Sequence, residues 1–517
     1  MRKLLSLTAH TAFLLAILHG FLNLAHASEP LAHLLKDINT APSPYRPGTA
    51  DSDLGMLATR SGDKLFFPAF TDAYGGELWM TDGTEEGTSL VKDVVPGMDP
   101  EFPFGVVPDT LRSLNGILLF VGFDETHGRE LWRSDGTEAG TFMVKDIFPG
   151  VFTSLIRMGI VFGDALYFTA DDGIHGQELW KTDGTEAGTA MVAEVKPGYD
   201  STFPSGFIVF NGKLFFAADD GVHGVELWET DGTAAGTVLV KDIDPSGSSG
   251  VILDVVGGGR LFLTADDGEH GNELWLTDGT GPGTVLVDIN PGPALSGADH
   301  FVRFGDLVYF SAVDGAHGVE LWKSDGTEAG TVMVKDINPG PSDSAPATFA
   351  QLGDRLLFTA EDPDHGRELW RSDGTEAGTI LVRDIAPGPA NSDRGIRPIV
   401  VGGILLFAAD DGTHGTELWR TDCTGAGTFL VQDIAPGAES STPLSLRSFR
   451  GLVFFFADDL VHGREPWIGR ASALACRPGV LEQSAERLSA SCQELRRGRP
   501  DRRGWLSRPG GVRTGQR

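Results

Sequence analysis

One phrase of amino acids recurs nine times along this 517-residue chain, and it constrains the fold more than any other feature. Each copy contains Glu-Leu-Trp, or Glu-Pro-Trp in the last copy, and successive tryptophans are 47–53 residues apart. A period of this size is typical of proteins that set one small structural unit side by side many times. The nine tryptophans are Trp79, Trp132, Trp180, Trp228, Trp275, Trp322, Trp370, Trp419 and Trp467.

The clearest copy, residues 206–245, divides into four short strands. Asn211-Gly212 separates the first two, and this pair accepts the positive φ angles of a tight hairpin turn. The second and fourth strands are apolar on both faces, which predicts a sheet that other sheets cover on both sides. The expected strands are residues 207–210, 213–218, 226–230 and 237–243.

The composition favours an all-β protein. The chain contains 69 Gly and 29 Pro, and both residue types disfavour helix interiors. A four-stranded antiparallel unit that repeats every 40–50 residues is typical of a β-propeller blade. The count of units predicts a β-propeller of nine blades, and eight blades with one peripheral unit is the alternative.

The two ends of the repeat region complement each other. The last copy stops after Glu465-Pro466-Trp467 and lacks the Asp-Gly-Thr turn and the fourth strand. Residues 34–39 (LLKDIN) match residues 334–338 (VKDIN), which follow the turn of a later copy. We therefore expect an N-terminal strand to complete the last blade and close the ring.

The repeat resembles the ELWxxDGT repeat proteins, an exported bacterial family found notably in myxobacteria. Residues 320–331 (ELWKSDGTEAGT) carry the motif in full, and the resemblance covers roughly residues 33–467. It implies a secreted or cell-surface repeat protein of unassigned activity. It implies no catalytic residue.

Both ends of the chain differ from the repeats. Residues 1–27 read as a signal peptide, because Arg2 and Lys3 precede a long apolar run and a small-residue cleavage site; an uncleaved membrane anchor is the alternative. We expect residues 28–470 to form the propeller, exported and without a membrane span after cleavage. Residues 471–517 are rich in Arg, Gly and Pro, which predicts a disordered basic tail.

The body of the chain is strongly acidic. The formal net charge is −31; residues 1–27 contribute +2 and residues 468–517 contribute +7, so residues 28–467 carry −40. Such a body repels nucleic acid, and no nucleic-acid partner is expected. The three cysteines do not make a disulfide framework: Cys423 stands where the other copies have Gly, and Cys476 and Cys492 lie in the tail.

Two polar motifs recur in the turns. We interpret Asp-Gly-Thr as turn chemistry, in which Asp caps its own turn, and it resembles the Asp-box hairpins of sialidase propellers. A second motif, Asp-Asp-Gly-x-His-Gly in its fullest form, has a histidine in eight copies. We expect these histidines to bond the backbone of a hairpin, with metal binding as the alternative. They are His127, His175, His223, His270, His317, His365, His414 and His462.

Paired aspartates precede the histidine in five copies, so one rim of the ring is expected to carry many carboxylates. No cofactor is required, but weak Ca²⁺ binding in roughly the 10⁻⁴–10⁻³ M range is predicted, with hairpin capping alone as the alternative. The candidate ligands are Asp171, Asp172, Asp219, Asp220, Asp266, Asp267, Asp410, Asp411, Asp458 and Asp459.

The glutamate of each Glu-Leu-Trp copy is expected to pair with a basic neighbour such as the lysine of the fourth strand. Catalysis needs one asymmetric group of residues, whereas these residues repeat in every copy. The favoured function is therefore a monomeric binding or adhesion module for an extracellular polysaccharide or surface protein. The alternative is a propeller hydrolase or lyase that acts on extracellular polysaccharide in the central channel. Departures at residues 99–104, 193–194 and 246–250 are interpreted as loop drift.

Overall fold

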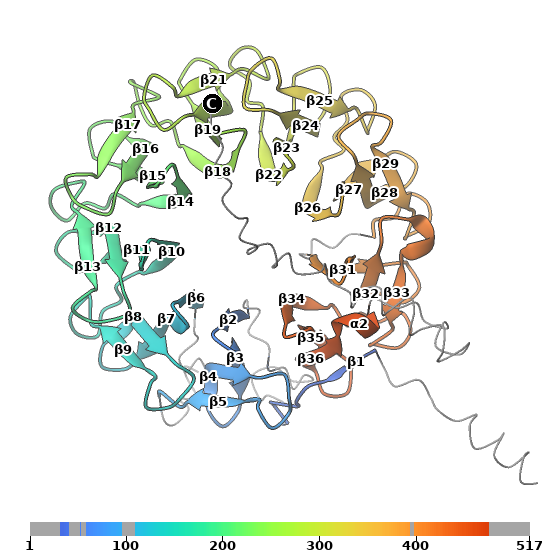
Figure 1. Ribbon diagram of the computed structural model, residues 1–517, viewed down its shortest axis with the longest axis horizontal. Coiled ribbons are helices and arrows are strands. Elements are labelled where there is room, and N and C mark those ends of the chain that lie inside the picture. Colours follow the sequence, from blue (N-terminus) through green and yellow to red (C-terminus); the bar gives the residue numbers. More distant parts are fainter. Residues whose placement is uncertain (1–30, 41–51, 53–57, 96–108, 393–397, 475–517) are drawn as a thin grey trace, which may run out of the picture.

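The computed structural model describes residues 31–40, 52, 58–95, 109–392 and 398–474. Within these residues, nine four-stranded antiparallel sheets stand around a central axis as the blades of a β-propeller (Figure 1). This confirms the predicted fold and the count of nine. Among the described residues, no helix is long and apolar enough to cross a membrane.

Eight blades are each built from four consecutive strands, and we number them in chain order. Blade 1 contains β2 (Thr59–Ser61), β3 (Lys64–Thr71), β4 (Gly75–Thr81) and β5 (Ser89–Lys92). Blade 2 contains β6 (Asp109–Leu114), β7 (Ile117–Asp124), β8 (Gly128–Ser134) and β9 (Phe142–Lys145). Blade 3 contains β10 (Arg157–Phe162), β11 (Ala165–Asp171), β12 (Gln177–Thr182) and β13 (Ala190–Ala193). Blade 4 contains β14 (Ser205–Phe210), β15 (Lys213–Asp219), β16 (Val225–Thr230) and β17 (Val238–Lys241).

The next four blades repeat this order. Blade 5 contains β18 (Ile252–Gly257), β19 (Arg260–Asp266), β20 (Asn272–Thr277) and β21 (Val285–Val287). Blade 6 contains β22 (Asp299–Phe304), β23 (Leu307–Ala312), β24 (Glu320–Ser324) and β25 (Val332–Lys335). Blade 7 contains β26 (Ala347–Leu352), β27 (Arg355–Asp362), β28 (Gly366–Ser372) and β29 (Ile380–Arg383). Blade 8 contains β30 (Ile399–Val401), β31 (Ile404–Asp410), β32 (Thr416–Thr421), the 3₁₀ turn η1 (Gly425–Gly427) and β33 (Phe429–Gln432).

The ninth blade joins the two ends of the chain. Strands β34 (Leu444–Phe449), β35 (Leu452–Asp458) and β36 (Arg464–Arg470) pair in sequence, and β1 (Ala32–Leu34) pairs antiparallel with β36 as the fourth strand. Ring closure is therefore confirmed, although β1 begins two residues before the expected start and ends at Leu34. Leu34 lies opposite Trp467, as Met333 lies opposite Trp322 in blade 6. The short helix α2 (Ala471–Leu474) follows β36, and Ala471 and Leu474 are buried against blades 8 and 9.

Burial falls from the inner strands of a blade to its outer edge. The second and third strands of blade 4, β15 and β16, are buried along most of their length, and Phe215 and Phe216 are fully buried. The fourth strand is not buried on both faces as expected: Val238 is exposed because β17 forms the perimeter of the ring. The predicted Asn211-Gly212 turn is present, with both residues at positive φ.

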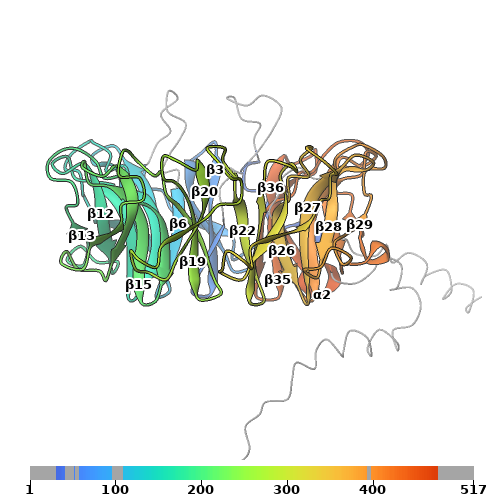
Figure 2. The same cartoon turned by 90° about the horizontal axis from the view of Figure 1, so that it is seen from above.

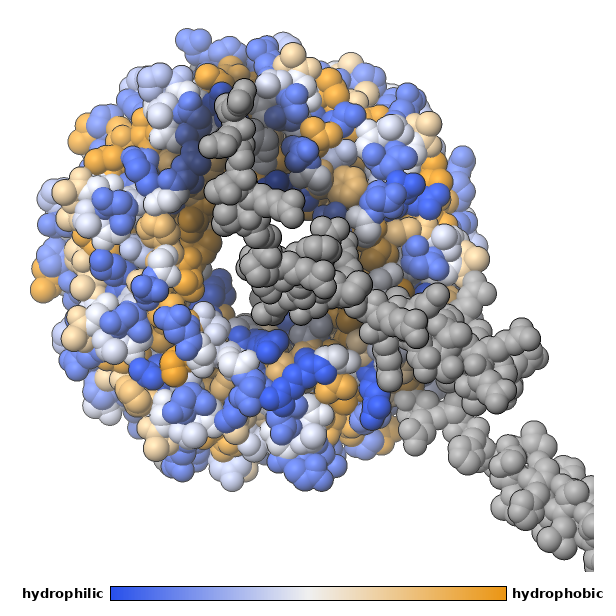
Figure 3. All heavy atoms as spheres, in the orientation of Figure 1, coloured by the Kyte–Doolittle hydropathy of each residue, from blue (hydrophilic) through white to orange (hydrophobic). Residues whose placement is uncertain are grey.

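The ring has two rims and an open centre. First strands face the axis (Figure 1), and all heavy atoms together leave a hollow in the middle of the ring (Figure 3). Because strands alternate in direction, the hairpins between second and third strands share one rim with the connections between blades. The helix α2 follows a third strand and lies at the lower rim in Figure 2, so these hairpins and connections form the upper rim.

Removing residues 31–40 is expected to open the ring. The deletion takes away β1, the buried side chains of Leu35 and Ile38, and the N–H groups that Ile38 and Asn39 donate to Glu465. At about 1.5–3 kcal/mol for each buried aliphatic side chain, we expect the free energy of unfolding to fall by about 5 kcal/mol. The unpaired edge of β36 is expected to promote aggregation. Chemical denaturation followed by tryptophan fluorescence measures the loss.

The matched control is His33→Ala, because the His33 side chain lies in the same strand but is exposed. This variant is expected to keep the denaturation midpoint of the wild-type protein. A deletion protein with an unchanged midpoint contradicts closure by β1.

Candidate functional site

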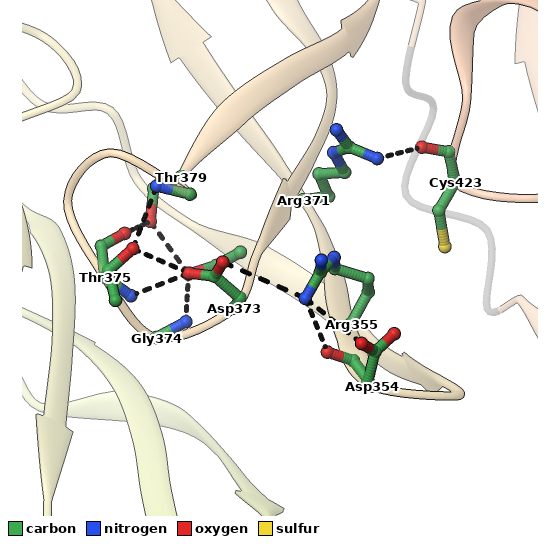
Figure 4. Close-up of polar contacts among 10 residues, drawn as sticks. Asp354, Arg355, Arg371, Asp373, Gly374, Thr375, Thr379 and Cys423 are labelled. Carbon is green, nitrogen blue, oxygen red and sulfur yellow. Dashed lines mark hydrogen bonds and ion pairs between the residues drawn. The ribbon is translucent and has the colours of Figure 1, made fainter.

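The Asp-Gly-Thr turns are held by hydrogen bonds within each turn. In blade 7, Oδ1 of Asp373 accepts from the N–H of Thr375 at 3.1 Å and from its hydroxyl at 2.7 Å, and Thr379 donates to the Thr375 carbonyl at 2.7 Å (Figure 4). Arg355 lies 3.8 Å from the same aspartate. The same bonds recur around Asp82, Asp135, Asp183, Asp231, Asp278, Asp325 and Asp422. These residues therefore stabilise turns.

Each of the eight motif histidines bonds an aspartate three residues before it. Nδ1 of His175 lies 2.7 Å from Oδ2 of Asp172, and the other seven pairs have distances of 2.7–3.0 Å. Each histidine therefore stabilises its hairpin as expected, but its ring binds a side-chain carboxylate rather than the backbone. This bond raises the pKa of each histidine.

The ten calcium candidates all lie in these hairpins. The first aspartate of each pair accepts the N–H of the residue two positions later, as Asp171 does from Gly173 at 2.7 Å. The second accepts two backbone N–H groups through Oδ1 and faces its histidine through Oδ2, as Asp172 does. Over the part of the chain that the structure describes, no group of three or more His, Cys, Asp or Glu side chains is arranged to hold a metal ion. Calcium binding stays a prediction.

The glutamate of the repeat phrase is fully buried in every blade. In blades 2–9 its described hydrogen bonds come from the segment that follows the fourth strand, and not from the fourth-strand lysine as expected. Oε2 of Glu320 accepts from the Ile337 N–H at 2.7 Å and from the Ser344 hydroxyl at 2.7 Å. Lys335 instead reaches the next blade, where its Nζ donates to the Thr379 carbonyl at 2.9 Å and lies over the Trp370 ring. The carboxylate therefore binds the segment that leads into the next blade.

Burial raises the pKa of the glutamates of blades 2–9, although hydrogen bonds to the carboxylates oppose the shift. The pKa of Glu130, Glu178, Glu320 and Glu368 rises to about 7, and that of Glu465 to about 8. Glu465 accepts from Ile38, Asn39 and Ser52, so the same bonding also fastens the closing segment.

Cys423 occupies a glycine position. Its φ is +72°, its side chain is buried, and burial raises the pKa of its thiol. Its carbonyl accepts from Arg371 at 2.8 Å (Figure 4), as the Gly374 carbonyl accepts from Lys323 in the preceding pair of blades. These features fit a glycine position that has drifted rather than a nucleophile. Cys476 and Cys492 lie outside the described residues.

Acidic side chains that differ between blades lie on two neighbouring inner strands. Asp254, on β18, has an exposed side chain, but desolvation by the atoms around it raises its pKa to about 6, and the carboxylate of Asp299, on β22, adds to the rise. His300 follows Asp299, and its Nδ1 lies 3.6 Å from that carboxylate. The sequence analysis missed this group, since first strands show no shared polar motif.

A second group of residues that differs between blades is apolar. Six large apolar side chains, with 57–79% of their surface exposed, lie in the hairpins and connections of blades 2–4 on the upper rim. Residues 193–194, one of the departures ascribed to drift, border this region, whereas residues 99–104 lie outside the described residues. We call the six residues the apolar rim patch: Val151, Phe152, Ile174, Tyr199, Phe203 and Val222.

No protein-family model and no curated protein matches this sequence. Solved structures do match. The computationally designed protein Ika8 is 15% identical with a TM-score of 0.39, over 72% of this chain and 98% of Ika8. A puromycin hydrolase mutant complexed with PGG is 14% identical with a TM-score of 0.35, over 72% of this chain and 61% of the hydrolase. A puromycin-hydrolyzing peptidase of Mycobacterium tuberculosis is 14% identical with a TM-score of 0.36, over 76% of this chain and 61% of the peptidase. This chain thus spans about 61% of the length of either hydrolase.

Calcium at ~1–5 mM is predicted to raise the melting temperature and to give weak heats of binding, since a cation that binds the folded state stabilises it by mass action. Calorimetry and thermal melts with and without Ca²⁺ measure both effects. Asp220→Asn is expected to reduce the calcium shift more than Asp231→Asn, which changes a turn on the opposite rim. A protein with no heat of binding and no shift in melting temperature contradicts the prediction and leaves hairpin capping alone.

The melting temperature is expected to fall between about pH 5.5 and about pH 8.5. The folded-state pKa values of the buried glutamates and of the paired histidines are raised, so the folded protein binds more protons than the unfolded chain. The glutamate contribution is fully present below about pH 4.5 and is lost as the pH rises through about 7 to 8. Calorimetric melts across this range measure the change.

Glu465→Gln removes the carboxyl group with the most strongly raised pKa. Its melting temperature should fall less between about pH 5.5 and about pH 8.5 than that of the wild-type protein. Glu186→Gln, at an exposed turn position, should keep the wild-type fall. A melting temperature that rises with pH in the wild-type protein, or an identical fall in Glu465→Gln, speaks against this role of the glutamates.

Proposed function

We propose that this protein is an exported binding module that presents contact loops on a rigid closed ring. One observation carries the proposal: the repeated polar motifs are engaged in hydrogen bonds within the ring, whereas side chains that differ between blades are exposed on one rim. Asp373, His175 and Glu320 each represent one such repeated motif. Identical motifs around a ring stabilise the scaffold, and a unique surface is what a partner distinguishes.

The location and the partners are part of the same proposal. The basic and apolar residues 1–27, which lie outside the described residues, support export, and the motif at residues 320–331 supports membership of the ELWxxDGT repeat family. The net charge of −40 over residues 28–467 opposes binding to nucleic acid and to a second copy. An extracellular polysaccharide or a surface protein is the proposed class of partner, and the protein acts as a monomer.

A second candidate function is cleavage of an extracellular polysaccharide in the channel, by hydrolysis or by a lyase reaction. Asp254 and Asp299 favour it, since they lie on neighbouring inner strands and a carboxyl group with a raised pKa, as Asp254 has, suits a general acid that acts on a glycosidic bond. Among the described first strands, only β6, β18 and β22 carry an acidic residue (Asp109, Asp254 and Asp299), so the set is asymmetric around the ring, as a catalytic site requires.

One experiment separates the two functions. Wild-type protein from residue 28 onward is applied to arrays of glycans and of short synthetic peptides, and the same glycans are assayed for released sugars. We expect retention on at least one array, no released product, and unchanged binding by Asp254→Asn. Release that is lost in Asp254→Asn establishes the second function, and absence of retention on every array contradicts the first.

A further inference from the structure

We propose that the apolar rim patch is the docking surface for a segment of a partner protein that carries apolar side chains flanked by Lys or Arg. The inference rests on the proposed binding function and names its surface and its partner. Monomeric proteins rarely expose large apolar side chains in a contiguous group unless something covers them. On this rim, such side chains gather in the loops of blades 2–4.

The patch is continuous because each connection packs on the hairpins beside it. A Cβ on Gly128, in blade 2, would lie 2.2 Å from the carbonyl oxygen of Phe152. A Cβ on Gly176, in blade 3, would lie 2.5 Å from that of Tyr199. Lys196, three residues before Tyr199, approaches Gly221 in the hairpin of blade 4, next to Val222. The exposed side chains therefore extend across three blades without a gap in the underlying backbone.

The patch is also held in place. The Phe148 ring stacks on the Phe152 ring at 5.1 Å, and Phe148 packs on Gly173, next to Ile174. The connection itself is bonded to both blades: the Ser154 N–H donates to the Arg129 carbonyl, and the Ser154 carbonyl accepts from Asp171. A surface ordered before binding loses little conformational entropy when a partner arrives.

Backbone strain occurs within and beside the patch. Phe203 has a φ of +50° and Leu155 a φ of +51°, in the left-handed region that favours glycine. The equivalent positions of the other described connections are Gly250, Gly297, Ala345 and Thr442, with φ between +42° and +57°. Phe203 and Leu155 are exposed, so core packing does not offset their strain. Among the described connections, only the two beside the patch place a large apolar side chain at this strained position, which points to a role outside the fold.

The charges around the patch select the occupant. The basic side chains of the surrounding segments 146–157, 171–176, 194–204 and 219–224 are Arg157, Lys196, His175 and His223. Lys196 is ion-paired with Asp219 at 3.1 Å, and each histidine is paired with an aspartate of its own hairpin. The carboxylates in those segments are Asp146, Asp171, Asp172, Glu194, Asp200, Asp219 and Asp220. An apolar centre with an acidic border attracts a basic, apolar segment and repels a second copy of this acidic chain. Aliphatic Val151, Ile174 and Val222 favour the side chains of a protein over a polysaccharide.

The test uses short synthetic peptides that alternate Leu or Phe with Arg, and matched peptides that carry Glu instead of Arg. We expect the wild-type protein to bind the Arg peptides, to ignore the Glu peptides, and to bind more weakly at high salt. Phe152→Ser combined with Tyr199→Ser should weaken binding by roughly tenfold or more. Val461→Ser is the matched control, since Val461 is equally exposed in blade 9 but outside the patch, and it should leave binding unchanged.

A second variant separates docking from folding. Leu155→Gly combined with Phe203→Gly relieves backbone strain, so we expect an unchanged or higher melting temperature together with weaker binding of the Arg peptides. A purely structural role for these residues would give the opposite change in melting temperature and no loss of binding.

Each remaining outcome decides the proposal. Three results overturn the inference and leave the binding function standing. The first is Arg-peptide binding that is unchanged in both combined variants. The second is binding of glycans that Phe152→Ser combined with Tyr199→Ser abolishes, and the third is dimerisation through the patch, measured by light scattering. Failure of the wild-type protein to bind any array overturns the binding function as well.

Discussion

The buried glutamate of the repeat phrase is the interaction on which the ring depends. In blade 6 the Glu320 carboxylate receives the Ile337 N–H and the Ser344 hydroxyl, so one side chain of a third strand holds the connection that leads into the next blade. In blade 9 the same carboxylate, Glu465, receives Ile38, Asn39 and Ser52 from the other end of the chain. Ring closure thus uses the same bonding that joins each of blades 2–8 to the blade that follows it, and the N-terminal segment fits because it brings the same backbone donors.

The repeated polar side chains bond within the ring itself. The carboxylates of Asp373 and Asp172 serve their own turns, and Lys335 joins its blade to the next. Buried glutamates and histidine–aspartate pairs are features that a sequence reader takes for catalytic or metal-binding groups, yet here they satisfy backbone donors that would otherwise be unpaired. A ring of equal blades offers a partner equal surfaces, so specificity must come from residues that break the repeat.

Much of the fold could be predicted because the repeat places each strand and turn at a fixed position within the period. The nine blades, the closing N-terminal strand and the Asn211-Gly212 turn follow from periodicity and from φ preferences. The partner of the glutamate could not be predicted, because backbone N–H groups have no residue identity; the one available signal was a Ser or Thr 23–24 residues later, such as Ser344 after Glu320. The end of the fourth strand was predicted wrongly because this bond was not foreseen. The strand was expected to reach Ile243, but it ends at Lys241, and the Ile243 N–H donates to the Glu226 carboxylate instead.

The apolar rim patch escaped the sequence analysis for a different reason. Phe203 and Leu155 look like ordinary loop variation until the backbone shows that both stand at left-handed positions that Gly250 and Gly297 fill without strain. A strained position costs about 1–3 kcal/mol. Ala345 and Thr442 carry that cost at equivalent positions with small side chains, whereas Leu155 and Phe203 carry it with large apolar ones. Both residues point a large side chain into solvent beside Tyr199 and Phe152. A single cause accounts for both the large apolar side chains at strained positions and the exposed apolar surface beside them: a partner buries this surface when it binds.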